Sequence, residues 1–150
     1  MSLGMTARRR RRRGAALVEF AVCAGLLLLI LFGLIEMGLL LGDQAALAEG
    51  AREAARSLAV GSAPSVASGR AVTTSGLPLT GGNVTLEKSR PDGNGSPTAW
   101  NPVGVSGAGN DATTGDFVRA TVRYNHPLVT SLIFAGGAKT LTAVLVMRRE

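Results

Sequence analysis

The longest apolar segment of the chain begins at Phe20 and has no polar side chain before Glu36. After that single acid, the segment continues to Gly42. About 20 apolar residues are enough for a helix to cross the hydrocarbon core of a bilayer. A removable secretory signal has a shorter apolar core, of roughly 7 to 15 residues. The pattern therefore predicts a membrane-spanning helix.

The helical pattern does not end with the apolar segment. Residues 43–60 are rich in Ala, Leu, Glu and Arg, which are strong helix formers, and no proline interrupts them. Gly61 and Pro64 indicate where the helix ends. One helix over residues 15–60 would be roughly 69 Å long, so its second half is expected to protrude from the membrane. Its apolar stripe faces either a partner or the protein's own outer domain; this stripe comprises Ala45, Leu47, Ala48, Ala51, Ala54, Ala55 and Leu58.

Beyond this helix, apolar and polar residues alternate in three segments, residues 83–90, 116–125 and 139–150. Alternation with many Val, Thr and Leu residues is typical of half-buried strands. The segments predict a small antiparallel sheet in a domain formed by residues 83–150. The predicted fold class is α+β: a long N-terminal transmembrane helix that continues outside the membrane, followed by this sheet domain.

The connections between these elements differ in character. Residues 61–82 form a small, polar linker in which residues 65–74 can form a short helix after Pro64. Residues 91–115 are rich in Gly and Pro and predict an extended loop. Trp100 lies in this loop, either docked on the sheet as an anchor or facing solvent as an adhesive contact. Residues 125–137 predict a turn and an apolar patch that covers one face of the sheet.

The positive charge of the chain is concentrated before the apolar segment. The net charge is +6, and beyond Gly14 ten basic residues balance ten acids. The excess therefore lies in six consecutive residues, Arg8, Arg9, Arg10, Arg11, Arg12 and Arg13. Positive flanks remain on the cytoplasmic side of a membrane, so the N-terminus is expected inside and the residues after Asp43 outside. Without another basic patch, and with few aromatic residues, nucleic-acid binding is not expected.

Two kinds of residue inside the apolar helix require a reason. Glu19 places a carboxylate close to a bilayer, where an acid normally has a partner or a task; otherwise it lies at headgroup level beside the arginines. Small residues spaced four apart allow helices to approach closely in lipid. The pairs Ala21/Gly25 and Gly38/Gly42 have this spacing. They predict packing against another helix.

Residues 14–20, GAALVEF, resemble the processing site of the type IV pilin superfamily. They follow a short basic leader, and Glu19 stands at the fifth position after Gly14, with the aromatic Phe20 next to it. The longer segment 14–60 resembles the TadE-like minor pilins, or pseudopilins, of the tight-adherence (Tad) pilus. The ending LTAVLVMRRE is similar to the terminal strand of that family.

The resemblance implies a pathway for the chain. A membrane-embedded prepilin peptidase would cut between Gly14 and Ala15 and release the leader, residues 1–14. Glu19 and Phe20 would then act in assembly, since the free amine of Ala15 supplies a cation for the buried carboxylate. Glu36, about 25 Å further along the helix, is expected either as a solvated interfacial acid or in an ion pair with a pilus subunit.

The resemblance also implies partners and a location. The partners are the prepilin peptidase, other major and minor pilins, the inner-membrane assembly platform and the lipid bilayer. The expected location is the bacterial inner membrane, crossed once, with a periplasmic C-terminal domain that can also join the adhesive pilus. A role as the major pilin is less expected, because the major pilins of this system are usually much shorter.

Candidate catalytic chemistry is sparse. His126 and Cys23 are the single histidine and cysteine, and no metal-ligand spacing accompanies them. The sequence therefore predicts no enzyme, no metal and no cofactor. Two alternatives to a pilin remain. One is an unprocessed single-pass, membrane-anchored extracytoplasmic binding domain, and the other is an enzyme with paired titratable residues in a pocket of the sheet domain.

Overall fold

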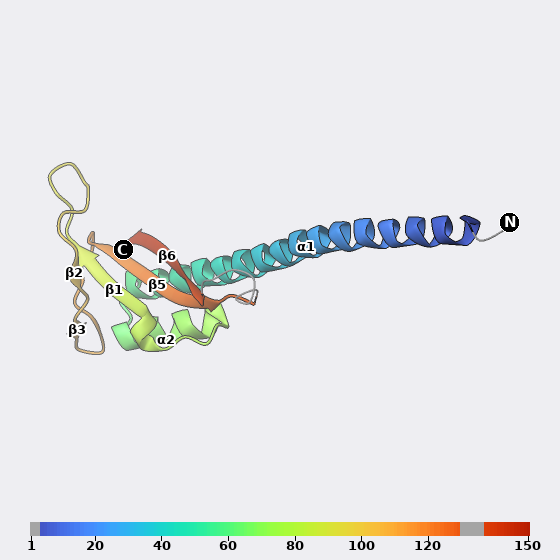
Figure 1. Cartoon of the computed structure of the whole chain (residues 1–150). Coiled ribbons are helices and arrows are strands. Elements are labelled where there is room, and N and C mark those ends of the chain that lie inside the picture. The colour runs from blue at the N-terminus through green and yellow to red at the C-terminus, as the bar shows by residue number, and fades with distance from the viewer. Residues whose placement is uncertain (1–3, 130–136) are drawn as a thin grey trace. The chain divides into compact units, whose positions relative to one another are not determined.

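The computed structural model describes the backbone of residues 4–129 and 137–150, and the side chains from Gly14 onward. Two compact units, Met1–Gly38 and Leu39–Glu150, divide the chain and are described separately. The helices are α1 (Gly4–Ala59) and α2 (Pro64–Ser75), both labelled in Figure 1, and the short 3-10 helix η1 (Gly81–Asn83). The strands are β1 (Val84–Ser89), β2 (Asn101–Pro102), β3 (Val105–Ser106), β4 (Gly109–Asn110), β5 (Phe117–Pro127) and β6 (Ala138–Arg148).

The long N-terminal helix is confirmed. By length and composition, residues Gly14–Ala59 of α1 can cross a membrane: their most apolar window has a mean hydropathy of 2.6, and none of it is buried inside the protein. Leu17, Phe20 and Leu27 are each about two-thirds exposed. The helix begins before this span, at Gly4, so most of the basic segment is helical as well.

α1 ends where the sequence indicates, and the backbone explains why. Gly61 adopts a left-handed conformation with φ of 88°. The N–H of Gly61 donates to the carbonyl of Leu58 at 2.9 Å, and the N–H of Ser62 donates to that of Ser57 at 3.0 Å. This pair of bonds is the Schellman motif, which satisfies carbonyls that the helix itself leaves unpaired. Pro64 then occupies the first turn of α2, where its missing N–H has no cost.

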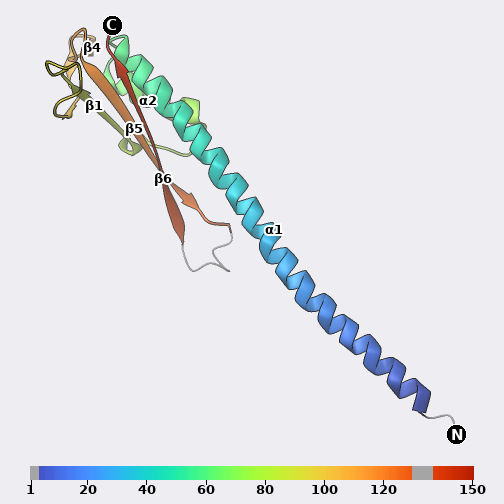
Figure 2. The ribbon, with the colours of Figure 1, turned by 90° about the horizontal axis from the view of Figure 1, so that it is seen from above.

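The unit Leu39–Glu150, named the outer unit from here on, contains an antiparallel sheet with the strand order β2-β1-β5-β6. Figure 2 shows β5 between β1 and β6. β1 and β5 pair through residues such as Leu86 and Ala120, and all eleven residues of β6 pair with β5. The three predicted strands and the α+β class are confirmed. The additional strand of this sheet, β2, is two residues long and belongs to the Gly-rich loop.

The predicted strand of residues 116–125 extends further than expected, because β5 continues through His126 to Pro127, the first residues of the segment predicted as a turn and an apolar patch. Asn125 is opposite Thr140 in β6, and the Thr140 hydroxyl donates to Asn125 Oδ1 at 2.8 Å. This side-chain bond compensates for the weak strand preference of Asn. The predicted apolar patch falls largely on residues 130–136, which lie outside the described residues.

The apolar stripe of α1 packs within its own domain. Leu47, Ala51 and Ala55 share one buried cluster with Ala120, Val122 and Ala143 of the sheet. Leu58 belongs to a second cluster with Val118. Of the stripe, only Ala45 and Ala48 remain exposed. Small side chains on both surfaces let the helix lie close to the strands, so most of the stripe is not available to a partner.

α2 packs against α1 at Gly50. A Cβ atom on Gly50 would lie 2.8 Å from the backbone oxygen of Ala71 and 3.2 Å from the Cβ of Ser75. Real Cβ atoms do not approach a backbone oxygen this closely, so glycine is needed for the observed helix spacing. Gly69, within α2, has no atom within 4 Å of an added Cβ.

We expect Gly50→Ala to lower the free energy of unfolding by about 1–2 kcal/mol, because α2 must move away from α1. Gly69→Ala is the matched control and should raise it by about 0.5–1 kcal/mol through helix propensity alone. Chemical denaturation of the full chain in detergent micelles measures both changes. Stabilisation by both alanines would contradict the close contact.

Candidate functional site

The N-terminal segment exposes the residues that the sequence predicts for processing. Gly14 and Ala15 lie on a helical backbone and are exposed, as is Glu19. Phe20 is 71 % exposed. The basic residues Arg8 to Arg13 are helical in their backbone, and their side chains lie outside the described part of the chain. The structure thus places the predicted cleavage bond and Glu19 on accessible, consecutive turns of α1.

The predicted packing residues also face outward. Ala21 and Gly25 are exposed, and so are Gly38 and Gly42. A Cβ atom added to any of the three glycines would meet no atom within 4 Å. The fold of the single chain therefore does not require glycine at these positions, whereas close approach of a second helix would use them.

Glu36 differs from the expectation of a solvated acid. Only 7 % of this residue is exposed, although the residues around it on the apolar helix are largely accessible. A buried carboxylate is costly unless it is hydrogen-bonded or paired. The structure therefore favours a specific interaction of Glu36 over free hydration.

Asn110 joins the Gly-rich loop to the end of α1. Its side-chain amide donates to the carbonyls of Leu58 and Ser62, each at 2.9 Å. Its Oδ1 accepts from the backbone N–H of Ala112 at 3.1 Å and from Arg149 at 2.9 Å. Asn110 is 5 % exposed, and its hydrogen-bonding groups are fully used. One side chain thus connects the helix end, the loop and the C-terminal residues.

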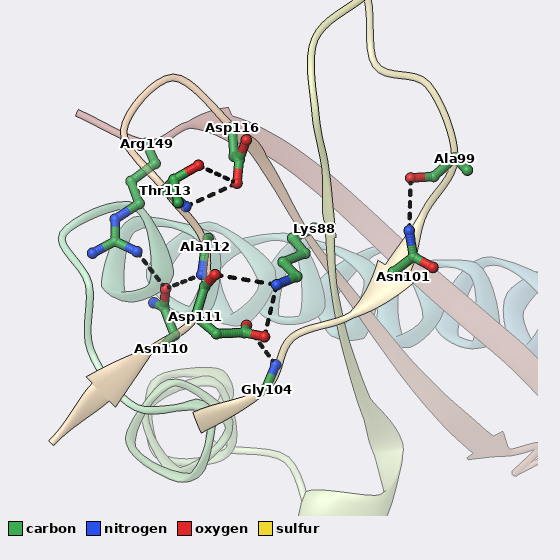
Figure 3. A network of polar contacts seen from close by, with 10 residues as sticks. All are labelled: Lys88, Ala99, Asn101, Gly104, Asn110, Asp111, Ala112, Thr113, Asp116 and Arg149. Carbon is green, nitrogen blue, oxygen red and sulfur yellow. Dashed lines mark hydrogen bonds and ion pairs between the residues drawn. The ribbon is translucent and has the colours of Figure 1, made fainter. Parts of the chain in front are cut away.

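Asp111 forms the second connection within the loop. Lys88 Nζ lies 2.7 Å from Asp111 Oδ2, and the N–H of Gly104 donates to Oδ1 at 2.7 Å (Figure 3). The hydrogen bond from Lys88, followed by that from Gly104, holds the pKa of the Asp111 carboxyl below its ordinary value and outweighs the opposite effect of burial. The charged carboxylate therefore fixes the loop to β1.

Trp100 docks on the sheet, which is the first of the two roles predicted for it. The Arg119 guanidinium lies 4.1 Å from the centroid of the Trp100 ring, within the range of a cation–π contact. Arg119 is itself fixed by Glu87, whose Oε2 accepts from Nε at 2.9 Å and from Nη2 at 2.6 Å. The tryptophan is partly exposed. It anchors the loop on the face of the sheet turned away from α1.

Sequence reasoning missed the role of His126. The side chain is almost fully buried, and its Nδ1 lies 2.6 Å from Asp43 Oδ2. A carboxylate only accepts, so the imidazole N–H donates. This bond joins β5 to α1 across 83 residues of sequence. The signal available was a single histidine in a strand pattern with an acid at the start of the protruding helix, which does not identify a pair.

The hollows on the outer unit are open and have mixed polar and apolar linings. One, of about 290 Å³, is lined by residues from β1, the loop and the start of β5, among them Lys88, Ser89, Asn101 and Asp116. Lys88 and Asp116 are already bonded to Asp111 and Thr113. In the described part of the chain, no three His, Cys, Asp or Glu side chains are grouped to hold a metal ion.

A long apolar helix joined to a small antiparallel sheet defines a helix-anchored α+β protein, and its length and composition support single-pass membrane anchoring. The family model described as "TadE-like protein" matches residues 14–56. The match confirms the resemblance drawn from the N-terminal helix and supports a TadE-like protein associated with the Tad pilus. Searches of curated proteins and of solved structures gave no match.

Lys88→Met should destabilise the outer unit by about 1 kcal/mol at neutral pH, because Asp111 loses its cation. The Asp111 pKa is lowered by folding, so this stabilisation is present above the unfolded-state pKa and is lost as pH falls through the folded-state value. The difference between wild type and variant should therefore shrink between about pH 6 and pH 2.5. Denaturant titrations at both pH values measure it.

Lys139→Met is the matched control, since this exposed lysine of β6 has no ion pair among the described residues. Its unfolding free energy should follow that of wild type at both pH values. An equal, pH-independent loss for Lys88→Met would show that the lysine acts through its alkyl chain or through its bond to the Asp111 carbonyl, at 3.1 Å, and not through the Asp111 charge.

Proposed function

We propose that this protein is a minor pilin, or pseudopilin, that acts in the assembly, priming or capping of a Tad-type pilus after its leader is removed. The match of residues 14–56 to the TadE-like model carries the proposal. The exposed Gly14–Ala15 bond, followed by an acid and a long apolar helix, supports it. The chain would enter the inner membrane with its arginines in the cytoplasm and its sheet domain in the periplasm.

The exposure of the apolar helix supports assembly with other subunits. The side chains described from Gly14 to Ile35 are almost all exposed, and the glycine pair Gly38/Gly42 leaves open space. Lipid can cover such a helix in the membrane, and only neighbouring helices can cover it in a fibre. The proposed partners are therefore major and other minor pilins, together with the assembly platform.

Glu19 has a specific role in this proposal. Cleavage after Gly14 creates an amine at Ala15, one helical turn before Glu19. A carboxylate that leaves the headgroup region for a fibre interior must be paired. The amine of Ala15, from the same or a neighbouring subunit, supplies the charge. Cleavage and assembly are then linked, because the partner of Glu19 does not exist before the leader is cut.

The intact mass and N-terminal sequence of the protein from its native membrane test the first step. In the presence of the prepilin peptidase the chain should begin at Ala15, and without the peptidase it should retain residues 1–14. Leader retention in both strains would favour the alternative, an unprocessed membrane-anchored binding domain.

Gly14→Leu should reduce cleavage at least tenfold. The substitution adds a side chain at the scissile bond. It also removes glycine, whose low helix propensity helps the backbone to unwind for a protease. Gly33→Ala, further along the same helix, is the control and should be processed like wild type. The ratio of cleaved to uncleaved mass is the measurement.

Glu19→Gln should leave cleavage intact but lower the amount of protein recovered with fibres at least tenfold. Glu49→Gln is the matched control, because Glu49 is exposed and bonded only to Arg52 of its own helix among the described contacts. Quantitative immunoblotting of sheared fibres and membranes measures the partition. Normal recovery of the Glu19 variant with fibres would contradict the proposed ion pair between Glu19 and the amine of Ala15.

A further inference from the structure

The two edges of the four-stranded sheet are unequal. One edge is β2, which contains Pro102 and pairs with β1 over only two residues. The other edge is β6, an eleven-residue strand that pairs with β5 alone among the described residues. Natural proteins usually shorten, charge or cover a sheet edge, because unpaired N–H and C=O groups accept further strands. The length of β6 therefore requires an explanation.

The free edge can be assigned to particular residues. Gln44 Nε2 donates to the carbonyl oxygen of Thr142 at 3.1 Å, so this carbonyl points away from β5. Backbone groups of an antiparallel strand alternate in direction every residue. The N–H and C=O of Val144 and Val146 therefore point to the same edge as those of Thr142. Val144 is 53 % exposed and Val146 is 43 % exposed.

α1 leaves room beside this edge. Gln44 marks the helix face that lies next to β6, and Ala48, one turn later on the same face, is exposed. Where β6 ends there is a hollow of about 310 Å³, lined by Arg56, Ala59, Val60, Met147, Arg148 and Glu150. An added strand lies about 4.8 Å from β6, with alternate side chains turned toward the helix. The small side chain of Ala48 can accommodate them.

We propose that the free edge of β6 accepts an extended strand from a different protein subunit, and that this strand carries an acidic residue at each end. β6 has one base near either end, Lys139 and Arg148, and no acid between them. Acids on the added strand would pair with these bases. Its central residues would be β-branched, to pack on Val144 and Val146.

A second copy of β6 offers no acid between Lys139 and Arg148 to pair with these bases. In a two-fold antiparallel pairing centred on Val144, Lys139 would also lie opposite Arg149 of the other copy, and like charges directly opposite each other destabilise a pair of strands. Main-chain bonds therefore give this edge its affinity, and the acids of the added strand distinguish it from a second copy. The inference goes beyond the proposed function and does not depend on leader cleavage, so either can fail alone.

The test uses the full chain in detergent micelles and two synthetic peptides. Both peptides have ten residues, the length from Lys139 to Arg148, with eight alternating Val and Thr residues in the middle. One peptide has Glu at both ends, and the other has Lys. The Glu-ended peptide should bind at least tenfold more tightly and slow amide hydrogen exchange at Val144 and Val146 at least tenfold. Equal affinity of the peptides, or unchanged exchange at both amides, would overturn the proposal.

Two variants separate main-chain pairing from charge. Val144→Pro removes an edge N–H but no bond to β5, and should weaken binding of the Glu-ended peptide at least tenfold. Val144→Thr keeps the N–H and should bind within twofold of wild type. If the proline variant unfolds, the double variant Lys139→Glu/Arg148→Glu tests the proposal instead. It should bind the Lys-ended peptide more tightly than the Glu-ended peptide. Concentration-dependent dimerisation that protects Val144 and Val146 would overturn the heterologous partner.

Discussion

The outer unit depends on the burial of one face of α1 beneath the sheet. Leu47, Ala51 and Ala55 pack against Ala120, Val122 and Ala143, and most of these side chains are alanine. Alanines on both surfaces bring the helix axis close to the strands, which leaves little volume for larger side chains. The same requirement explains Gly50, where α2 meets α1 too closely for a Cβ atom. A long helix and a small sheet can thus share a core with few large residues.

The Gly-rich loop has no apolar core of its own and is held by side chains together with short stretches of backbone pairing, such as that of β2 with β1. Asn110 bonds the helix end, Asp111 bonds Lys88, and Trp100 lies on Arg119. Each bond joins the loop to an element distant in sequence. A loop of 25 residues with little secondary structure would otherwise be expected to be mobile. Its glycines and prolines set the backbone path, while three polar or aromatic side chains fix that path to the domain.

The two units use their surfaces in opposite ways. In the outer unit most of the apolar stripe of α1 is buried in the core, and the exposed features are a polar sheet face and the edge of β6. From Gly14 to Ile35, by contrast, the helix exposes apolar side chains that lipid or other helices must cover. A subunit that leaves the membrane for a fibre has to replace its contacts with lipid by contacts with other helices. The small residues and Glu19 lie on the part of the helix where that exchange would occur.

The sequence by itself determined the long helix, its end at Gly61, the three main strands and the resemblance of residues 14–60. These features depend on local signals: an uninterrupted apolar run, a glycine before a proline, and alternation with period two. The extent of β5, the role of Trp100 and the burial of Glu36 were decided only by tertiary structure. So was the bond between Asp43 and His126, because residues 83 positions apart carry no pairing signal in one sequence. The edge at β6 likewise follows from strand order, which alternation along a single chain cannot specify.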